Sequence, residues 1–206
     1  MAGRIITARH GRPDLSREVK LSAADYGEWW QEYDRSGLAP DQTPPDSLVS
    51  LAKNAATILS SDLLRALETA HAIAGRDDIV GDAAFVEAHL PPPPFPLIKA
   101  GPQFWGVASR VCWMMGYAPG DFEPVSKAWQ RVGRFTDRLI EESQHGDVVL
   151  CAHGYLNWMI DRELRKRRQW AMVARDRGND YWSWRAYLPS AVDQVATNPD
   201  MTQATI

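Results

Sequence analysis

Residues 147–154, DVVLCAHG, indicate the fold most clearly in this chain of 206 residues. A second run of the same form, RIITARHG at residues 4–11, also ends at a His-Gly pair. An apolar run without alternation is typical of a strand that is buried on both faces, as in a parallel sheet. The two runs therefore predict two central strands, over residues 4–8 and 147–152, with a helix beginning just after His153.

Between these runs, apolar residues recur with helical spacing. They predict amphipathic helices over residues 48–59, 63–73 and 125–140, the second of them capped by Ser or Asp at 60–62. Strands that alternate with helices indicate an α/β fold. We expect a three-layer αβα sandwich with a mostly parallel central sheet, which binds its ligand beyond the carboxyl ends of the strands.

Two proline-rich stretches, at residues 39–47 and 91–96, interrupt this pattern. The second cannot lie inside a helix or a central strand, and a short amphipathic segment follows it. We therefore expect a helical flap over about residues 91–124, inserted after a middle strand and lying over the strand ends. The predicted organisation is a single domain over residues 1–190, followed by a loosely ordered tail at 191–206.

The composition excludes several classes of function. A formal net charge of −3 provides no general basic field, which argues against nucleic-acid or membrane partners. The start of the chain does not resemble a signal peptide, so a cytoplasmic location is predicted. The two cysteines, Cys112 and Cys151, lack the paired spacing of a zinc site and are interpreted as reduced and buried. The oligomeric state remains open.

Three short segments could carry chemistry: Arg9-His10-Gly11, residues 60–70 (SSDLLRALETA) and residues 151–154 (CAHG). Each by itself has an ordinary structural interpretation, such as a loop histidine or a capped helix with a solvated arginine. Together they place an Arg or a His at each of three transitions from strand to helix. Such transitions meet at one crevice in an α/β sheet, so we expect these side chains to converge there.

In this order, the three segments resemble the signatures of the histidine phosphatase, or phosphoglycerate mutase-like, superfamily, over roughly residues 4–165. The resemblance implies that His10 is a nucleophile that forms a phosphohistidine. It also implies that Arg9, Arg65 and His153 hold the phosphoryl group. The family commonly has a polar residue six positions after the nucleophile, and here that position is Ser16, a less certain phosphate ligand.

The chemistry of these side chains agrees with the implied roles. A mostly neutral imidazole can attack phosphorus without a separate base, while the Gly11 carbonyl holds its other ring nitrogen. Two guanidinium groups and a protonated His153 can donate to the three equatorial phosphoryl oxygens. This reaction requires neither a metal nor another cofactor.

The leaving oxygen needs a proton, which the family supplies from an acid after a middle strand. That strand is predicted at residues 84–87, and Glu87 is the favoured donor because a closed site can raise the pKa of a carboxyl group. His89 is the alternative donor, since it would point to the same side of an extended chain. Its ordinary interpretation is a loop histidine.

The flap lacks the basic, glycine-rich stretch with which the sugar-acid mutases hold a second anionic group. It is rich instead in large apolar side chains, among them Trp105, Trp113, Met114 and Met115. This composition favours a small apolar or aromatic substrate, even if most of these residues belong to the core.

The predicted function is therefore a metal-independent phosphomonoester hydrolase, a phosphatase of the histidine acid type, whose partner is a small-molecule phosphomonoester. Two alternatives stay open: a phosphoglycerate mutase-like phosphoryl transferase, and a catalytically silent module that binds phosphorylated ligands. A zinc-dependent hydrolase is a weaker reading, because His10, His89 and His153 lie in separate segments without metal-ligand spacing.

Overall fold

The computed structural model describes residues 2–95, 97–167, 170–176, 178 and 180–190. Within this part, six strands form one sheet in the order β3-β2-β4-β1-β6-β5. They are β1 (Ile5–Arg9), β2 (Thr57–Ser61), β3 (Gly81–Asp82), β4 (Val148–Ala152), β5 (Trp170–Asp176) and β6 (Trp184–Pro189). β3, β2, β4 and β1 pair in parallel, whereas β6 is antiparallel to both β1 and β5.

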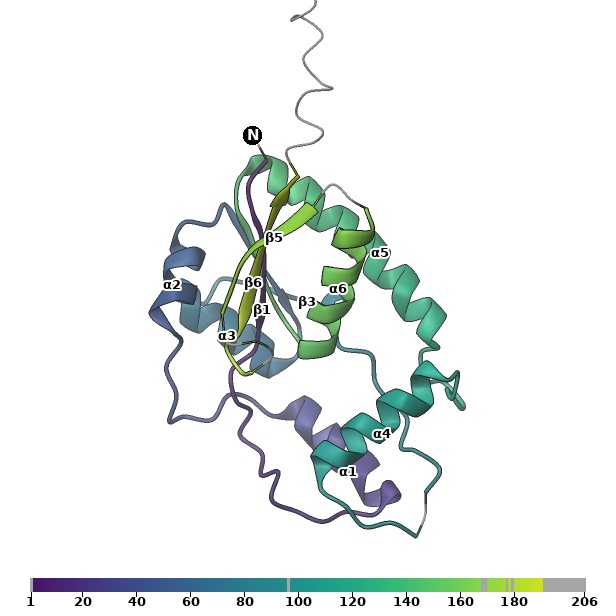
Figure 1. Ribbon diagram of the computed structural model, residues 1–206. Helices are drawn as coiled ribbons and strands as arrows, with labels where there is room; N and C mark the ends of the chain where they lie inside the picture. Colours follow the sequence, from purple (N-terminus) through teal and green to yellow (C-terminus); the bar gives the residue numbers. More distant parts are fainter. Residues whose placement is uncertain (1, 96, 168–169, 177, 179, 191–206) are drawn as a thin grey trace, which may run out of the picture.

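The α-helices of the described residues are α1 (Ala23–Arg35), α2 (Asp46–Lys53), α3 (Leu64–Ala74), α4 (Pro102–Met114), α5 (Val125–Glu142) and α6 (Gly154–Lys166). Figure 1 shows α2 and α3 on one face of the sheet, α5 and α6 on the other, and α1 with α4 beyond one end of the strands. The predicted α/β fold with a mostly parallel sheet between helical layers is confirmed.

Burial on both faces explains the continuous apolar runs. Every residue of β4 is buried. Its Val148 and Leu150 pack in the hydrophobic cluster under α5 and α6, whereas Val149 and Cys151 pack in the cluster under α2 and α3. Since successive side chains of a strand point to opposite faces, a strand between two helical layers must be apolar at every position.

The helix predicted over residues 48–59 is wrong in its second half. Helix α2 ends at Lys53, and Ile58 and Leu59 belong to strand β2. β2 pairs in parallel with the central strand β4, which satisfies its backbone hydrogen-bonding groups. The apolar spacing fits both a helix and a buried strand, so only the pairing with β4 decides between them.

The strand predicted at residues 84–87 is also wrong. β3 consists of Gly81 and Asp82 alone, and a 3₁₀ turn follows at Ala83–Phe85. The turn is held by the side chain of Asp82, which accepts a hydrogen bond from the N–H of Ala84 at 2.8 Å. Glu87 therefore lies in a loop after this turn instead of at the end of a strand.

The cap predicted for the helix at residues 63–73 is wrong as well. The residue that caps α3 is Leu63, and no side chain makes a capping hydrogen bond to the helix. Ser61 instead accepts a hydrogen bond from the N–H of Leu63 at 3.3 Å, just before the helix. The hydroxyl of Ser61 thus orders the turn from β2 into α3.

Helices α1 and α4 cover the carboxyl end of β1 (Figure 1). α1 was not predicted, although Ser22 and Asp25 form a capping box at its start. α4 occupies most of the amphipathic part of the expected flap, and Pro102 stands in its first turn. None of the helices in the described ranges has the length and apolar character needed to cross a membrane. The expected tail at residues 191–206 lies outside the described residues.

Candidate active site

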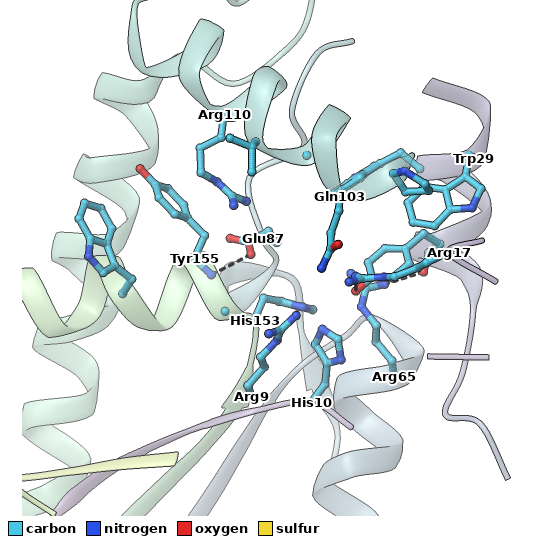
Figure 2. Close-up of a pocket in the computed structure, with 17 residues that line it drawn as sticks. Arg9, His10, Arg17, Trp29, Arg65, Glu87, Gln103, Arg110, His153 and Tyr155 are labelled. Carbon is cyan, nitrogen blue, oxygen red and sulfur yellow. Dashed lines mark hydrogen bonds between the residues drawn. The ribbon is translucent and has the colours of Figure 1, made fainter. Parts of the chain in front are cut away.

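A cavity of 380 Å³ is lined by residues that follow the carboxyl ends of β1 and β4 and by residues of α1, α4 and α6. It is lined by Arg9, His10, Arg17, Trp29, Trp30, Tyr33, Arg65, Glu87, Pro102, Gln103, Gly106, Val107, Arg110, His153, Gly154, Tyr155 and Trp158. Five of the predicted site residues therefore meet in one cavity, although they come from four separate parts of the chain (Figure 2). Ser16 and His89 are not among the lining residues.

His10 is 2% exposed, and its orientation is fixed by the backbone. Its Nδ1 lies 2.7 Å from the carbonyl oxygen of Gly11. Because a carbonyl oxygen only accepts, Nδ1 must carry the hydrogen, which leaves Nε2 as the nitrogen with the free lone pair. Burial lowers the pKa of His10, and the neighbouring His153 and Arg65 lower it further. The neutral, nucleophilic form is therefore the favoured one.

Arg65 is 1% exposed and is held by α1. Its Nη1 donates to the Tyr33 carbonyl at 2.8 Å, and its Nη2 donates to the Asp34 carboxylate at 3.1 Å. The guanidinium also lies 4.4 Å from the centre of the Tyr33 ring. These contacts fix the plane of the guanidinium beside His10, with its Nε lacking a hydrogen-bond partner among the described residues. Arg9 lies over the ring of Tyr181, 4.6 Å from its centre.

His153 stands at the start of α6, with its ring centre 5.2 Å from that of His10. Its Nε2 lies 2.9 Å from the hydroxyl oxygen of Ser61. Burial lowers the pKa of His153, and the charges of Arg65 and Arg9 lower it further. The sequence predicts a protonated ring at this position, whereas its surroundings favour a neutral ring in the free site. A bound phosphoryl dianion supplies the opposite charge that favours protonation.

Glu87 lies over the cavity from the loop after β3. Its Oε2 accepts a hydrogen bond from the N–H of Tyr155 at 3.2 Å, in the first turn of α6. Its Oε1 is buried and has no hydrogen-bond partner within the described residues. Burial raises the pKa of Glu87, although Arg110 acts against this rise. The raised pKa suits a carboxyl group that must carry a proton to a leaving oxygen.

The other two predicted site residues lie elsewhere. His89 has an exposed side chain, whose ring packs edge-on against Phe122 at 5.2 Å between centres. Ser16 is exposed, and its hydroxyl accepts a hydrogen bond from the N–H of Glu18 at 3.2 Å. The residue that this segment brings to the cavity is the next one, Arg17.

Arg17 and Arg110 are the charged lining residues that sequence analysis missed. Arg110 comes from α4, lies 4.2 Å from the centre of the Tyr155 ring, and has a buried Nε without a hydrogen-bond partner among the described residues. Its signal in the sequence is helical spacing, since Gln103, Val107 and Arg110 share one face of α4 and all line the cavity.

The four large apolar flap residues on which the substrate prediction rests do not line the cavity. Trp105 and Trp113 are fully buried and pack in two different hydrophobic clusters, whereas Met114 and Met115 are exposed. The aromatic walls of the cavity come instead from α1 and α6, as Trp29, Trp30, Tyr33, Tyr155 and Trp158. In the described ranges, no group of three or more His, Cys, Asp or Glu side chains is placed to hold a metal ion.

The lowered pKa values of His10 and His153 can be measured directly. We expect both rings to remain neutral at about pH 6, where an imidazole with the ordinary pKa of about 6.5 is mostly protonated. The measurement is a ¹⁵N NMR titration, with the signals assigned by their loss in His10→Asn and His153→Asn. A positively charged ring at that pH in the ligand-free protein would contradict the electrostatic description of the site.

Comparison with known proteins places these residues in a wider group. Residues 48–185 match the sequence profile of the histidine phosphatase superfamily (branch 1). This range contains Arg65, Glu87 and His153 and begins after Arg9 and His10. No curated protein sequence matches the chain significantly.

Solved structures with the same fold include a mycobacterial glucosyl-3-phosphoglycerate phosphatase complexed with VO3. It is 21% identical, with a TM-score of 0.57 over 92% of this chain and 98% of that one. The native structure of this phosphatase gives 22% identity and a TM-score of 0.53, over 81% of each chain. A mutant phosphoserine phosphatase from Entamoeba histolytica, in complex with phosphoserine, gives 16% identity and a TM-score of 0.51, over 80% of each chain. At such identities, the likeness establishes the fold.

Proposed function

Because this chain belongs to the histidine phosphatase superfamily (branch 1), we propose that it hydrolyses a phosphomonoester through a phosphohistidine formed on His10. The observation that carries the proposal is the orientation of His10, whose Nδ1 is bound to the Gly11 carbonyl. This contact leaves Nε2 unprotonated in a cavity that Arg9 and Arg65 also line. Structural relatives that are themselves named phosphatases add support.

The reaction has two steps. In the first, the lone pair of His10 Nε2 attacks phosphorus, the bond from phosphorus to the leaving oxygen breaks, and Glu87 donates its proton to that oxygen. In the second, Glu87 removes a proton from water, which attacks the phosphohistidine and releases inorganic phosphate and the neutral ring. Each proton that Glu87 gives in the first step is thus recovered in the second.

The phosphoryl oxygens carry the charge of the transition state, and cationic donors stabilise it. Arg9 and Arg65 supply guanidinium N–H groups in fixed planes, and His153 supplies a ring N–H. Since the residues that hold Arg65 in place are already present in the free protein, little reorganisation is needed when the charge develops.

The substrate that we propose is a small phosphomonoester with an apolar or aromatic leaving group. The tryptophan and tyrosine side chains of α1 and α6 form the walls against which such a group would pack. These walls take the place of the apolar flap residues on which the sequence-based expectation depended.

A phosphoryl transferase of the phosphoglycerate mutase-like type is the second candidate, because Arg17 and Arg110 line the same cavity. Two further guanidinium groups can hold a second anionic group on a substrate or acceptor. The two reactions differ in the fate of the phosphoryl group. Quantitative release of inorganic phosphate supports the hydrolase, whereas recovery of the label on an added hydroxy acid supports the transferase. A silent binding module would give neither product.

We expect phosphate release from a panel of phosphomonoesters to continue unchanged in the presence of a metal chelator, because the proposed steps use only side chains. Vanadate should inhibit strongly, since it resembles the transferring phosphoryl group in its five-coordinate state. The measurement is phosphate release with and without each compound. Activity that is lost with chelator and restored by zinc or magnesium would overturn the proposed mechanism.

The role of Glu87 can be tested with leaving groups of different basicity. A general acid matters most for an alkyl leaving oxygen and least for nitrophenolate, which leaves unprotonated. We therefore expect Glu87→Gln to lower kcat/KM by about a hundredfold on an alkyl phosphate and much less on nitrophenyl phosphate.

His89→Asn is the matched control, because this exposed ring packs against Phe122 outside the cavity. It should leave both rates close to those of the unmodified protein. If His89→Asn shows the contrast between leaving groups and Glu87→Gln does not, the donor is His89. Equal losses on both substrates from Glu87→Gln would assign Glu87 to positioning only.

A further inference from the structure

Trp182 has a backbone conformation that is unusual for a large side chain. Its φ angle is 63°, and it is the one non-glycine residue with positive φ in the part of the chain that the structure describes. Such a conformation is unfavourable for a bulky residue and persists where the surroundings hold it. Trp182 is 5% exposed and lies two positions before the start of β6, the strand that pairs with β1.

The contacts of Trp182 are made to the segment that carries His10. Its N–H faces the carbonyl oxygen of His10 at 3.4 Å. Its indole lies so close to Gly11 that a Cβ atom at this position would be 2.4 Å from the ring carbon Cζ2. Gly11 is thus a position where the absence of a side chain lets the indole approach the backbone next to the nucleophile.

The indole N–H of Trp182 donates to the side-chain oxygen of Gln42 at 2.8 Å. The same Gln42 oxygen accepts the backbone N–H of Arg12 at 2.7 Å, and the Gln42 amide nitrogen donates to the carbonyls of Arg12 at 2.6 Å and Ala39 at 2.9 Å. These four hydrogen bonds occupy both acceptor positions of the amide oxygen and both N–H groups of the amide nitrogen. They therefore determine which end of the Gln42 amide is the oxygen. Gln42 belongs to the proline-rich loop at residues 39–47, to which sequence analysis assigned no role.

These contacts form a continuous series that ends at His10. The peptide group between Gly11 and Arg12 has its N–H on Gln42 and its carbonyl on His10 Nδ1. Turning this peptide would break both hydrogen bonds together. Trp182 therefore fixes Gln42, Gln42 fixes the peptide, and the peptide fixes the ring of His10.

We propose that Trp182 and Gln42 are positioning residues for the nucleophile, which hold the peptide after Gly11 so that its carbonyl keeps His10 in one tautomer with Nε2 directed into the cavity. The inference rests on the proposed function, because it concerns the attack of His10 on phosphorus. Neither residue lines the cavity around His10, although both line an adjoining cavity that shares Arg9, Arg17 and Gln103 with it.

The expected consequence is a loss of rate without an equal loss of phosphate binding. If the orientation of the His10 ring is less restricted, Nε2 reaches the geometry needed for attack less often. Arg9 and Arg65 continue to hold the phosphoryl group. Gln42→Ala removes the link to the peptide. Trp182→Phe keeps a ring against Gly11 but removes the indole N–H. Trp184→Phe is the matched control, because its indole N–H donates to Ser47, at 3.3 Å and outside this series.

The experiment measures the single-turnover rate of phosphohistidine formation with nitrophenyl phosphate, together with the inhibition constant of inorganic phosphate. We expect Gln42→Ala and Trp182→Phe each to lower the rate by on the order of tenfold or more, with the inhibition constant nearly unchanged. The double variant should lose little beyond the worse single variant, because both act through one series of contacts. Trp184→Phe should match the unmodified protein.

Unchanged rates in Gln42→Ala and Trp182→Phe overturn the inference, as does a parallel weakening of phosphate inhibition, which marks a general structural role. If Gln42→Ala fails to fold, Trp182→Phe decides, since it keeps the packing against Gly11. Phosphohistidine formation in the unmodified protein distinguishes a failure of this inference from a failure of the proposed function. If that protein forms no phosphohistidine, the proposed function fails and the inference with it. If it forms one and the variants are equally fast, the inference alone fails.

Discussion

His10→Ala is expected to abolish turnover almost completely and to leave no phosphate on the protein after rapid quenching. In the unmodified protein, the same quench should trap an adduct that is labile in acid and stable in alkali, as a phosphohistidine is. The physical reason is that no phosphohistidine can form without the ring that accepts the phosphoryl group, so the second step has no intermediate to hydrolyse. The measurement is recovery of labelled phosphate on the protein, followed by peptide mapping.

The fold should survive His10→Ala, because the strand that carries it is paired on both sides by β4 and β6. An unchanged circular dichroism spectrum and the retained binding of inorganic phosphate serve as the control. An adduct on a serine or cysteine in the unmodified protein would reject the histidine mechanism. Full turnover in His10→Ala would do the same.

Arg65→Lys is expected to lower kcat/KM by on the order of a hundredfold or more. Arg65 is held in a fixed plane by the Tyr33 carbonyl and the Asp34 carboxylate, with its guanidinium over the Tyr33 ring. The ammonium of lysine keeps the charge but cannot reproduce a planar group that meets several acceptors in these directions.

Arg165→Lys provides a matched control, because Arg165 is half exposed and pairs with Asp161 within α6, away from the cavity. It should leave kcat/KM close to that of the unmodified protein. The two variants are compared by steady-state kinetics on one substrate. A loss in Arg65→Lys no greater than that in Arg165→Lys would place Arg65 outside the group that stabilises the transition state.

The central strands could be predicted because their signal is local. An apolar residue at every position of β4 reflects helices on both faces of the sheet. The end of the helix predicted over residues 48–59 could not be placed, because the apolar spacing of its second half suits a helix and a strand equally well. Only the neighbouring strand β4, nearly a hundred positions away in the chain, decides that Ile58 and Leu59 are extended.

The core of the candidate site could be predicted for a similar reason. His10, Arg65 and His153 each follow a strand of the same sheet, and parallel strands bring their carboxyl ends together. Arg17 and Arg110 could not be placed in this way. They reach the cavity through α1 and α4 and their connections, whose position beyond the sheet depends on packing between distant segments.

Trp182 and Gln42 mark the limit of sequence reasoning most clearly. Their hydrogen bond joins residues 140 positions apart, and the strained backbone of Trp182 has no local sequence signal. Gly11 stands out in the sequence because it follows a histidine, but the residue that requires a glycine there is Trp182, from the other end of the domain.

The antiparallel hairpin of β5 and β6 has a further consequence for the strand that bears the nucleophile. β6 pairs along β1 from Ile5 to Ala8, so the hairpin makes β1 an interior strand. A shortened protein that ended before β5 would retain His10, Arg65, Glu87 and His153, yet its nucleophile strand would become an open edge. Unpaired backbone groups beside an apolar strand invite pairing with other molecules. Such a fragment would therefore keep all the reacting groups, but β1 would be exposed as an edge strand that favours aggregation.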